Sequence, residues 1–157
     1  MQTVSKYMSQ HHAELDLLFE EFVGQQADKP AQAIPVADKF RLGLLNHIVW
    51  EEEILFPVFD ERSGMQGCGP TAVMRSEHGR IKELLEEISA KLSRNELAGL
   101  AEPENELAEI LRSHNRKEEN ILYPSIDALL TDEERENAFA RMAAIVAPQT
   151  SLVARSA

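Results

Sequence analysis

The sequence predicts an all-α fold: an up-down-up-down antiparallel four-helix bundle with a short fifth helix at its C-terminal end. Apolar residues recur mostly every three or four positions, which is the spacing of amphipathic helices. The 157 residues include only 7 Gly and 7 Pro, which is few for an all-β chain with its many turns. A helical hairpin of about 66 residues occurs twice, and two such hairpins can pack face to face as a bundle.

The helices are separated by segments that favour turns. The four bundle helices are expected over residues 4–23, 36–60, 70–92 and 103–130. The links between them, 24–35, 63–70 and 95–102, are polar or contain Gly and Pro. Thr131 followed by Glu134 is the pattern of a capping box, so a shorter fifth helix is expected over 132–147.

Two finer expectations concern the second and fourth helices. The inward-facing seam of the fourth helix is expected to include Ile121, in the place that Ile54 takes in the second. Pro57 and Pro124 are expected to kink or break their helices, because proline lacks the backbone N–H that a helix interior needs.

Composition and charge fit one globular domain. Apolar residues make up 43% and charged residues 27%, and we expect a single domain over residues 1–147 with a tail over 148–157. The net charge of −11 repels phosphate backbones, so nucleic acid is not an expected partner.

The sequence has no apolar run of membrane-spanning length and no N-terminal signal pattern, so we expect a cytoplasmic protein without membrane association. The single Cys68 excludes an internal disulfide and a cysteine-based metal cage.

The hairpin repeat covers residues 4–62 and 70–130. A shift of 66 residues places the first helix on the third, and a shift of 67 places the second on the fourth. These shifts align three pairs of polar residues: His12 with His78, His47 with His114, and Glu51 with Glu118. Each bundle helix therefore carries one histidine in an apolar seam, and the second and fourth helices add a glutamate one turn later.

These six side chains predict a two-metal site. A buried carboxylate without a partner is costly, and no Lys or Arg occupies the seams to neutralise two of them. A pair of metal ions is the simplest remaining source of positive charge. Imidazole and carboxylate ligands without thiolate favour iron, manganese or zinc. Six protein ligands shared by two ions would leave positions open for a small molecule, whereas a structural zinc site is normally closed.

Several neighbouring residues have two possible roles. The repeat aligns His11 with Glu77, so we interpret His11 as a surface residue, with contact behind a ligand as the alternative. Glu52 and Glu119 lie off the ligand face, where they form a solvated edge or orient their neighbours. Tyr123 is expected to pack through its ring, with the alternative that its hydroxyl reaches a bridging ligand.

A doubled motif carries a resemblance to a known family. Its two copies are His47-x-x-x-Glu51-Glu52-x-x-Leu55-Phe56-Pro57 and His114-x-x-x-Glu118-Glu119-x-x-Leu122-Tyr123-Pro124. Each copy follows a histidine that lies 35 or 36 residues upstream, His12 or His78. Over about residues 5–130 the chain resembles the hemerythrin-like HHE cation-binding family. The resemblance implies a four-helix bundle with a non-haem di-iron site, and it places the six residues above at ligand positions.

The sequence departs from the oxygen-carrying hemerythrins, which use five histidines, a glutamate and an aspartate. Lys82 stands where a second histidine would follow His78, and Glu118 takes the place of the aspartate. Four histidines and two glutamates are more similar to the di-iron domain of bacterial iron-centre repair proteins. Those proteins usually carry a short N-terminal domain with cysteine, for which this sequence has no counterpart. Reversible oxygen carriage and iron-centre repair are therefore both less expected.

Three functions remain open. The first is a metal-binding protein whose di-iron centre handles O2, NO or peroxide, or senses iron. The second is a di-iron enzyme or an iron-centre repair factor in nitrosative or oxidative stress, with a partner protein as electron donor. The third is a structural module in which zinc staples the bundle. Two iron ions are the expected cofactors, with zinc or manganese as substitutes, and a small diatomic or oxo species is the expected ligand. No pattern indicates an oligomeric state.

Overall fold

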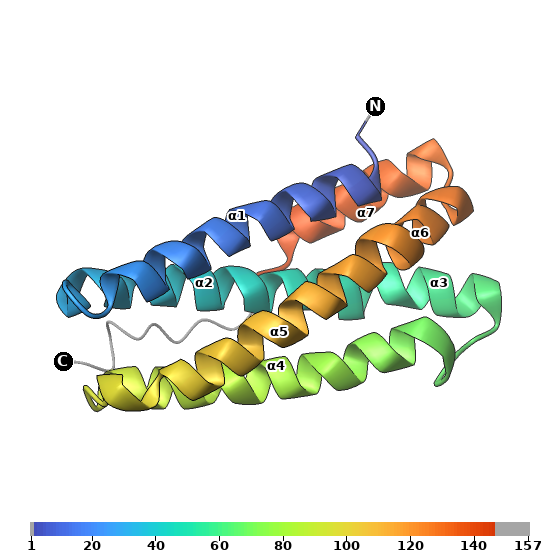
Figure 1. Cartoon of the computed structure of the whole chain (residues 1–157). Coiled ribbons are helices and arrows are strands. Elements are labelled where there is room, and N and C mark those ends of the chain that lie inside the picture. The colour runs from blue at the N-terminus through green and yellow to red at the C-terminus, as the bar shows by residue number, and fades with distance from the viewer. Residues whose placement is uncertain (1, 147–157) are drawn as a thin grey trace.

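A computed structural model describes residues 2–146, and all secondary structure within this range is helical. The elements in chain order are α1 (Val4–Gln25), α2 (Pro30–Trp50), η1 (Glu51–Leu55), α3 (Phe56–Ser63), α4 (Gly69–Ser93), η2 (Leu97–Gly99), α5 (Ala101–Lys117), η3 (Glu118–Leu122), α6 (Tyr123–Leu129) and α7 (Asp132–Ala144). Elements α2, η1 and α3 form one continuous helical stretch, and so do α5, η3 and α6. Figure 1 shows the long stretches side by side, with α7 close to α1. The predicted bundle with a fifth helix is confirmed.

Helix α2 begins at Pro30 rather than at residue 36, so the predicted link over 24–35 is shorter than expected. Pro30 suits the first helical position because its missing N–H is not needed there. Pro35 lies inside the helix and removes one backbone hydrogen bond. Ala33 and Ala37 are buried in the core on either side of it, and this packing offsets the loss.

The predicted capping box of α7 is present. Thr131 Oγ1 accepts a hydrogen bond from the backbone N–H of Glu134, and the Glu134 carboxylate accepts one from the backbone N–H of Thr131 at 2.8 Å. Helix α7 ends at Ala144 rather than at residue 147, because Ile145 is extended and packs against apolar side chains. The predicted tail over 148–157 lies outside the described residues.

Two π-helical turns, η1 and η3, replace α-helical turns in the long stretches. In η3 the backbone N–H of Tyr123 bonds to the carbonyl of Glu118, and in η1 that of Phe56 bonds to the carbonyl of Glu51. Such a turn contains more residues than an α-turn, and it is frequently found at functional sites. The prediction for Pro57 and Pro124 was a kink or a break. The helix continues beyond both prolines, so neither breaks its helix, and the kink stays a prediction.

The π-turn in η3 also changes which residues face the core. Ile121, predicted to point inward, is 58% exposed, while Leu122 and Tyr123 are buried. Tyr123 lies five positions after Glu118. Because a π-helical turn contains more residues than an α-helical turn, Tyr123 faces nearly the same side of the helix as Glu118. Ile54 is buried as predicted because α7 packs against η1. The described structure gives Ile121 no comparable cover.

The apolar core is divided into two clusters along the bundle. The first apolar cluster surrounds Leu15, Leu44, Ile81 and Leu107, and the second contains residues such as Met8, Ile54, Phe56 and Ile126. On each long helix the predicted metal ligands lie between residues of the first cluster and residues of the second. The bundle therefore has a buried polar layer between two apolar regions.

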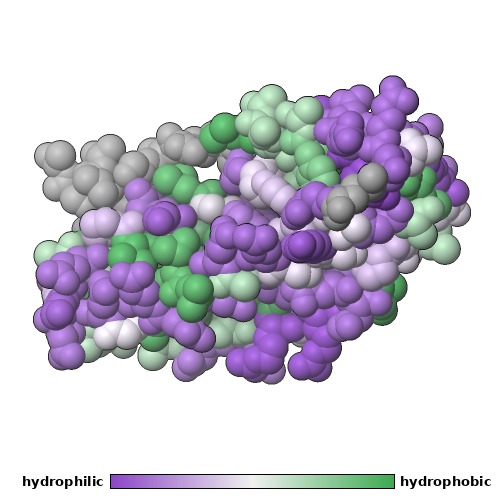
Figure 2. Space-filling view, turned by 90° about the horizontal axis from the view of Figure 1, so that it is seen from above, coloured by the Kyte–Doolittle hydropathy of each residue, from purple (hydrophilic) through white to green (hydrophobic). Residues whose placement is uncertain are grey.

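The outer surface is mostly polar. Figure 2 shows a largely hydrophilic face with apolar residues in smaller, separate areas. This agrees with the net charge of −11 and with the amphipathic pattern of the helices. Within residues 2–146, no helix is both long enough and apolar enough to cross a membrane.

Candidate metal centre

The structure brings all six predicted ligands together in the polar layer. A four-ligand cluster contains Glu51, His78, His114 and Glu118. A three-ligand cluster contains His12, His47 and Glu118. In each cluster, one nitrogen or oxygen from every side chain lies within 4.8 Å of the others, and each residue is at most 4% exposed. That these six residues bind metal stays a prediction. The prediction required their side chains to converge in space, and they do.

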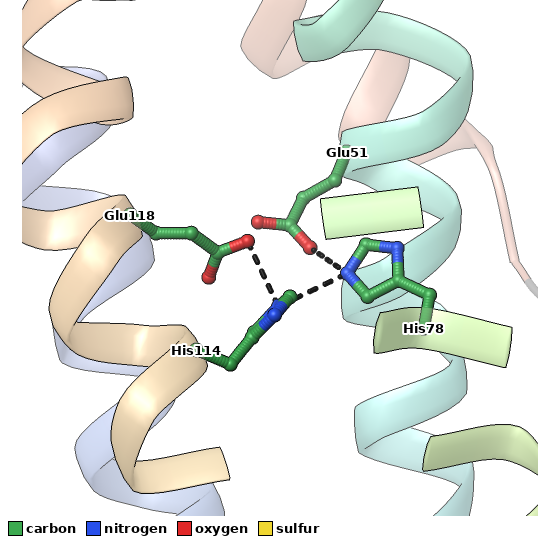
Figure 3. Close-up of side chains that lie close together, drawn as sticks. All are labelled: Glu51, His78, His114 and Glu118. Carbon is green, nitrogen blue, oxygen red and sulfur yellow. Dashed lines mark hydrogen bonds and ion pairs between the residues drawn. The ribbon is translucent and has the colours of Figure 1, made fainter. Parts of the chain in front are cut away.

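The four-ligand cluster is drawn from three helical stretches. Figure 3 shows the two imidazoles and the two carboxylates pointing toward one another. His78 Nε2 lies 3.1 Å from Glu51 Oε2, and His114 Nε2 lies 2.9 Å from Glu118 Oε1. The two Nε2 atoms are themselves 3.1 Å apart. Four potential donor atoms therefore surround one small volume.

Each carboxylate also reaches the three-ligand cluster with its second oxygen. Glu51 Oε1 lies 3.5 Å from His47 Nε2, and Glu118 Oε2 lies 3.4 Å from His12 Nε2. Glu51 and Glu118 thus each present one oxygen to each pair of histidines. This is the arrangement that a carboxylate needs to bridge two metal ions.

Two of these oxygens are unsatisfied, which tests whether the residues fit a metal. Glu51 Oε2 and Glu118 Oε1 are buried and accept no hydrogen bond from the described residues. Imidazole nitrogens lie close to both, but none of them is oriented to donate a hydrogen bond. Buried polar atoms without a partner are rare, and an ion that the chain is built to hold is one explanation. A cation between the nitrogen lone pairs and these oxygens fits the geometry.

The outer nitrogens of three histidines face carboxylates on neighbouring helices. The Nδ1 distances are 2.8 Å from His12 to Glu119, 2.9 Å from His78 to Glu52 and 2.8 Å from His114 to Glu77. A carboxylate acceptor favours the tautomer with its hydrogen on Nδ1, and that tautomer leaves Nε2 free to bind a metal. Glu52 and Glu119 therefore orient their neighbours, which was one of their two predicted roles. Sequence reasoning missed Glu77, although it directly precedes His78 and aligns with His11.

The fourth histidine, His47, has another histidine behind it. Its Nδ1 lies 2.8 Å from Nδ1 of His11, and the two rings are stacked at 5.0 Å. Burial, then the charges on His47 and His12, lowers the pKa of His11 to about 4, so that His11 is neutral at pH 7 and can accept a hydrogen bond from His47. The interpretation of His11 as a surface residue is wrong, since it is half-buried and lies behind a candidate ligand.

The charges in the polar layer compensate one another. Burial raises the pKa of Glu51, but His47 and His78 outweigh this effect and hold it well below its ordinary value. Burial lowers the pKa of His78, but the carboxylates of Glu51 and Glu52, one beside each ring nitrogen, outweigh this and raise it to about 9. At pH 7 the metal-free site therefore pairs its carboxylates with a protonated His78, whereas burial lowers the pKa of His47. A metal ion would displace the proton of His78, because a histidine binds metal in its neutral form.

The hydroxyl of Tyr123 lies inside the three-ligand cluster. It is 2.5 Å from Glu51 Oε1 and 3.0 Å from Glu118 Oε2, and it lies 3.2 and 3.3 Å from Nε2 of His47 and His12. Burial, together with the charges on Glu51 and Glu118, raises the pKa of Tyr123 well above its ordinary value, so the hydroxyl keeps its proton and donates to a carboxylate. The expectation of a packing role was therefore incomplete.

A solvent-exposed groove lies beside the site. It has a volume of about 600 Å³ and lies between α1 and α5, with Asp16, Glu20, Arg112 and Glu119 among its lining residues. The groove does not reach the predicted ligands directly. Glu119 separates it from His12, so this carboxylate lies between solvent and the polar layer.

A helical bundle with buried clusters of histidine and glutamate defines a class of protein: a helical cation-binding protein. Residues 3–126 match the hemerythrin HHE cation binding domain. The match extends over most of the sequence, and the chain belongs to the hemerythrin HHE cation-binding family.

Two curated relatives are iron-sulfur cluster repair proteins. The chain is 35% identical over 111 residues to the iron-sulfur cluster repair protein YtfE of Cronobacter sakazakii (strain ATCC BAA-894). The aligned region covers 62% of this chain and 49% of the relative. It is 39% identical over 93 residues to the protein of the same name from Escherichia coli O81 (strain ED1a), covering 52% of this chain and 40% of the relative. The chain thus spans half or less of the length of these relatives. No solved structure matches the chain significantly.

Proposed function

We propose that this chain holds two iron ions between the four histidines and two glutamates of the polar layer, and that it handles a small oxygen or nitrogen species such as O2, NO or peroxide. One observation carries the proposal. Glu51 and Glu118 each direct one oxygen to the His78–His114 pair and the other to the His12–His47 pair. Two bridging carboxylates with two histidines at each end are a ligand set for a pair of ions.

The chemistry of the donors supports iron. Imidazole and carboxylate ligands without sulfur suit iron, and six protein donors leave coordination positions free on two ions. When bound, iron would supply redox chemistry and affinity for diatomic ligands. The chain's own residues orient the histidines through Glu52, Glu77 and Glu119, and the apolar clusters on both sides exclude water. Turnover would also need an electron-donor protein as a partner.

A second candidate function is the repair of iron-sulfur clusters. The names of the two relatives favour it, as does the predicted ligand set of four histidines and two glutamates. Because the chain spans only 49% and 40% of these relatives, their activity is a proposal for this protein.

Anaerobic loading with Fe(II) tests the proposed function. We expect two iron ions per chain and a change in the absorption spectrum when O2 or NO is added. Glu118→Ala should abolish paired binding, because Glu118 belongs to both clusters. Glu53→Ala is the matched control, since Glu53 is an exposed glutamate close to Glu51 in the sequence, and it should bind iron like the natural chain.

Each outcome separates the candidate functions. Absence of bound iron would overturn the proposal. Binding of zinc with no spectral response to O2 or NO in the iron-loaded protein would favour a zinc-stapled structural module. Reactivation of an NO-damaged iron-sulfur enzyme by the iron-loaded chain, beyond the effect of free Fe(II), would favour repair.

A further inference from the structure

The two halves of the polar layer are related by the hairpin repeat, yet they differ at two pairs of positions. The contact of His78 with Glu52 has its counterpart in that of His12 with Glu119. By the same repeat, Tyr123 corresponds to Phe56, and His11 corresponds to Glu77. Because the two repeats differ at these two pairs of positions, different side chains surround the two proposed metal positions.

The first difference lies inside the site. In the three-ligand cluster the Tyr123 hydroxyl lies between the two histidines. Its single O–H can donate to Glu51 Oε1 at 2.5 Å, and Glu118 Oε2 lies 3.0 Å away as a second acceptor. In the four-ligand cluster the corresponding residue, Phe56, stacks flat on His78 at 5.7 Å and brings no polar atom. An ion entering the three-ligand cluster must therefore compete with a hydrogen-bonded hydroxyl for the same carboxylate oxygens.

The second difference lies behind the histidines. Both histidines of the four-ligand cluster donate their outer N–H to a carboxylate, and these carboxylates pair in turn with Lys82 and Lys117. In the three-ligand cluster Nδ1 of His47 instead faces Nδ1 of His11 at 2.8 Å, so an imidazole stands where a carboxylate stands behind His114. A carboxylate behind a histidine raises its basicity, and such partners are worth roughly 10–100-fold in metal affinity. Of the two histidines in the three-ligand cluster, His47 lacks this support.

We propose that the two metal positions are inequivalent: the four-ligand cluster binds its ion first and more tightly, and the three-ligand cluster binds second and exchanges its ion more readily. This inference rests on the proposed binding of two ions. It assigns Tyr123 and His11 as positioning residues that tune the second position. It also places the more readily exchanged ion in the cluster that His12 and Glu119 separate from the groove between α1 and α5.

Stepwise titration of the full chain with Fe(II) alone, without oxygen, tests the proposal. Calorimetry should show two binding steps whose dissociation constants differ by about tenfold or more. Mössbauer spectra with ⁵⁷Fe should show one iron environment at one equivalent and a second environment only as the second equivalent is added. Two environments that fill together from the first addition would overturn the inequivalence.

A matched pair of variants assigns the steps. His11→Glu places a carboxylate behind His47, and it should tighten the second step by about tenfold while leaving the first unchanged. Glu77→His removes the carboxylate behind His114, and it should weaken the first step by about tenfold. If His11→Glu changed only the first step, the assignment would be wrong. Circular dichroism of the metal-free variants checks that they are folded.

Tyr123→Phe gives a second line of evidence with little change in volume, since it copies the residue at position 56. It should tighten the second step more than the first, because it removes the hydroxyl that competes for Glu51 and Glu118. A weaker second step would show that Tyr123 is itself a ligand and would overturn this part of the proposal. Two ions bound with equal affinity would contradict the inequivalence of the two positions but not the proposed function. Absence of bound iron would contradict the proposed function itself.

Discussion

At the scale of single residues, the polar layer depends on two fully buried carboxylates. Glu51 and Glu118 are both 0% exposed, and such groups are very costly unless they are paired. In the metal-free protein part of this pairing comes from His78, whose raised pKa keeps it protonated at pH 7. The pKa of His12 and of His114 would fall through burial alone, but the neighbouring carboxylate of Glu118 raises both. The site therefore exchanges protons for metal, and its behaviour should depend on pH.

The metal-free protein should lose stability as the pH rises from 6.5 to 9. The pKa of His78 is raised from 6.5 to about 9 in the folded chain, so its contribution to stability is fully present below pH 6.5 and is lost as the pH rises through 9. Thermal unfolding in the presence of a chelator across this range measures the effect. Glu52→Gln should flatten the dependence, because it removes one of the carboxylates that raise this pKa. A melting temperature that stays constant over the range would contradict a protonated His78.

At the scale of elements, the spacing of residues predicted the helices but not their local geometry. Histidine and glutamate one turn apart, repeated in a second hairpin, were enough to identify the six converging side chains. The π-turns have no signature in the three-four pattern, so the burial of Ile121 was predicted wrongly and the position of the Tyr123 hydroxyl stayed open. Glu77 was missed because its partner, His114, lies on another helix, and periodicity along one helix cannot show such a contact.

The capping box of α7 should contribute measurably to stability. Thr131→Ala removes the side-chain acceptor for the N–H of Glu134, and loss of such a cap costs about 1 kcal/mol. Helix α7 covers Ile54 and adds Ala138 and Met142 to the second apolar cluster, so the loss should appear in the global unfolding free energy. Denaturant unfolding measures it, with Glu136→Ala at an exposed position of the same helix as the control. Equal midpoints for Thr131→Ala and the natural chain would show that the cap adds nothing.

The same cap should be sensitive to acid. The hydrogen bond from Arg62, followed by those from Thr131, lowers the pKa of Glu134 to about 2 from 4.5. A carboxyl group with a lowered pKa stabilises the fold above its unfolded value and loses this effect as the pH falls through its folded value. Glu134→Gln should therefore be less stable than the natural chain at pH 6, and the difference should shrink between pH 4.5 and 2. A difference independent of pH would show that the charge of Glu134 is not involved.

At the scale of the whole molecule, the polar layer interrupts the hydrophobic core where the four long helical stretches meet. The four candidate histidines come one each from α1, α2, α4 and α5, and the apolar clusters lie to either side. A pair of ions bound there would connect all four stretches at once and relieve the burial of like-charged carboxylates. Metal binding should therefore act on the cooperative unfolding of the entire bundle rather than on one helix.

Iron should raise the stability of the chain by mass action. A ligand that binds only the folded state adds about 2.7 kcal/mol at a free concentration of 100 times its dissociation constant. Anaerobic thermal unfolding should show a higher midpoint with Fe(II), and a chelator should reverse the rise. With a net charge of −11 the surface can also attract cations, so Glu118→Ala and Glu53→Ala separate the two effects. The rise should disappear in Glu118→Ala and persist in Glu53→Ala. If it persisted in both, the stabilising ions would be held by surface carboxylates and not by the polar layer between the apolar clusters.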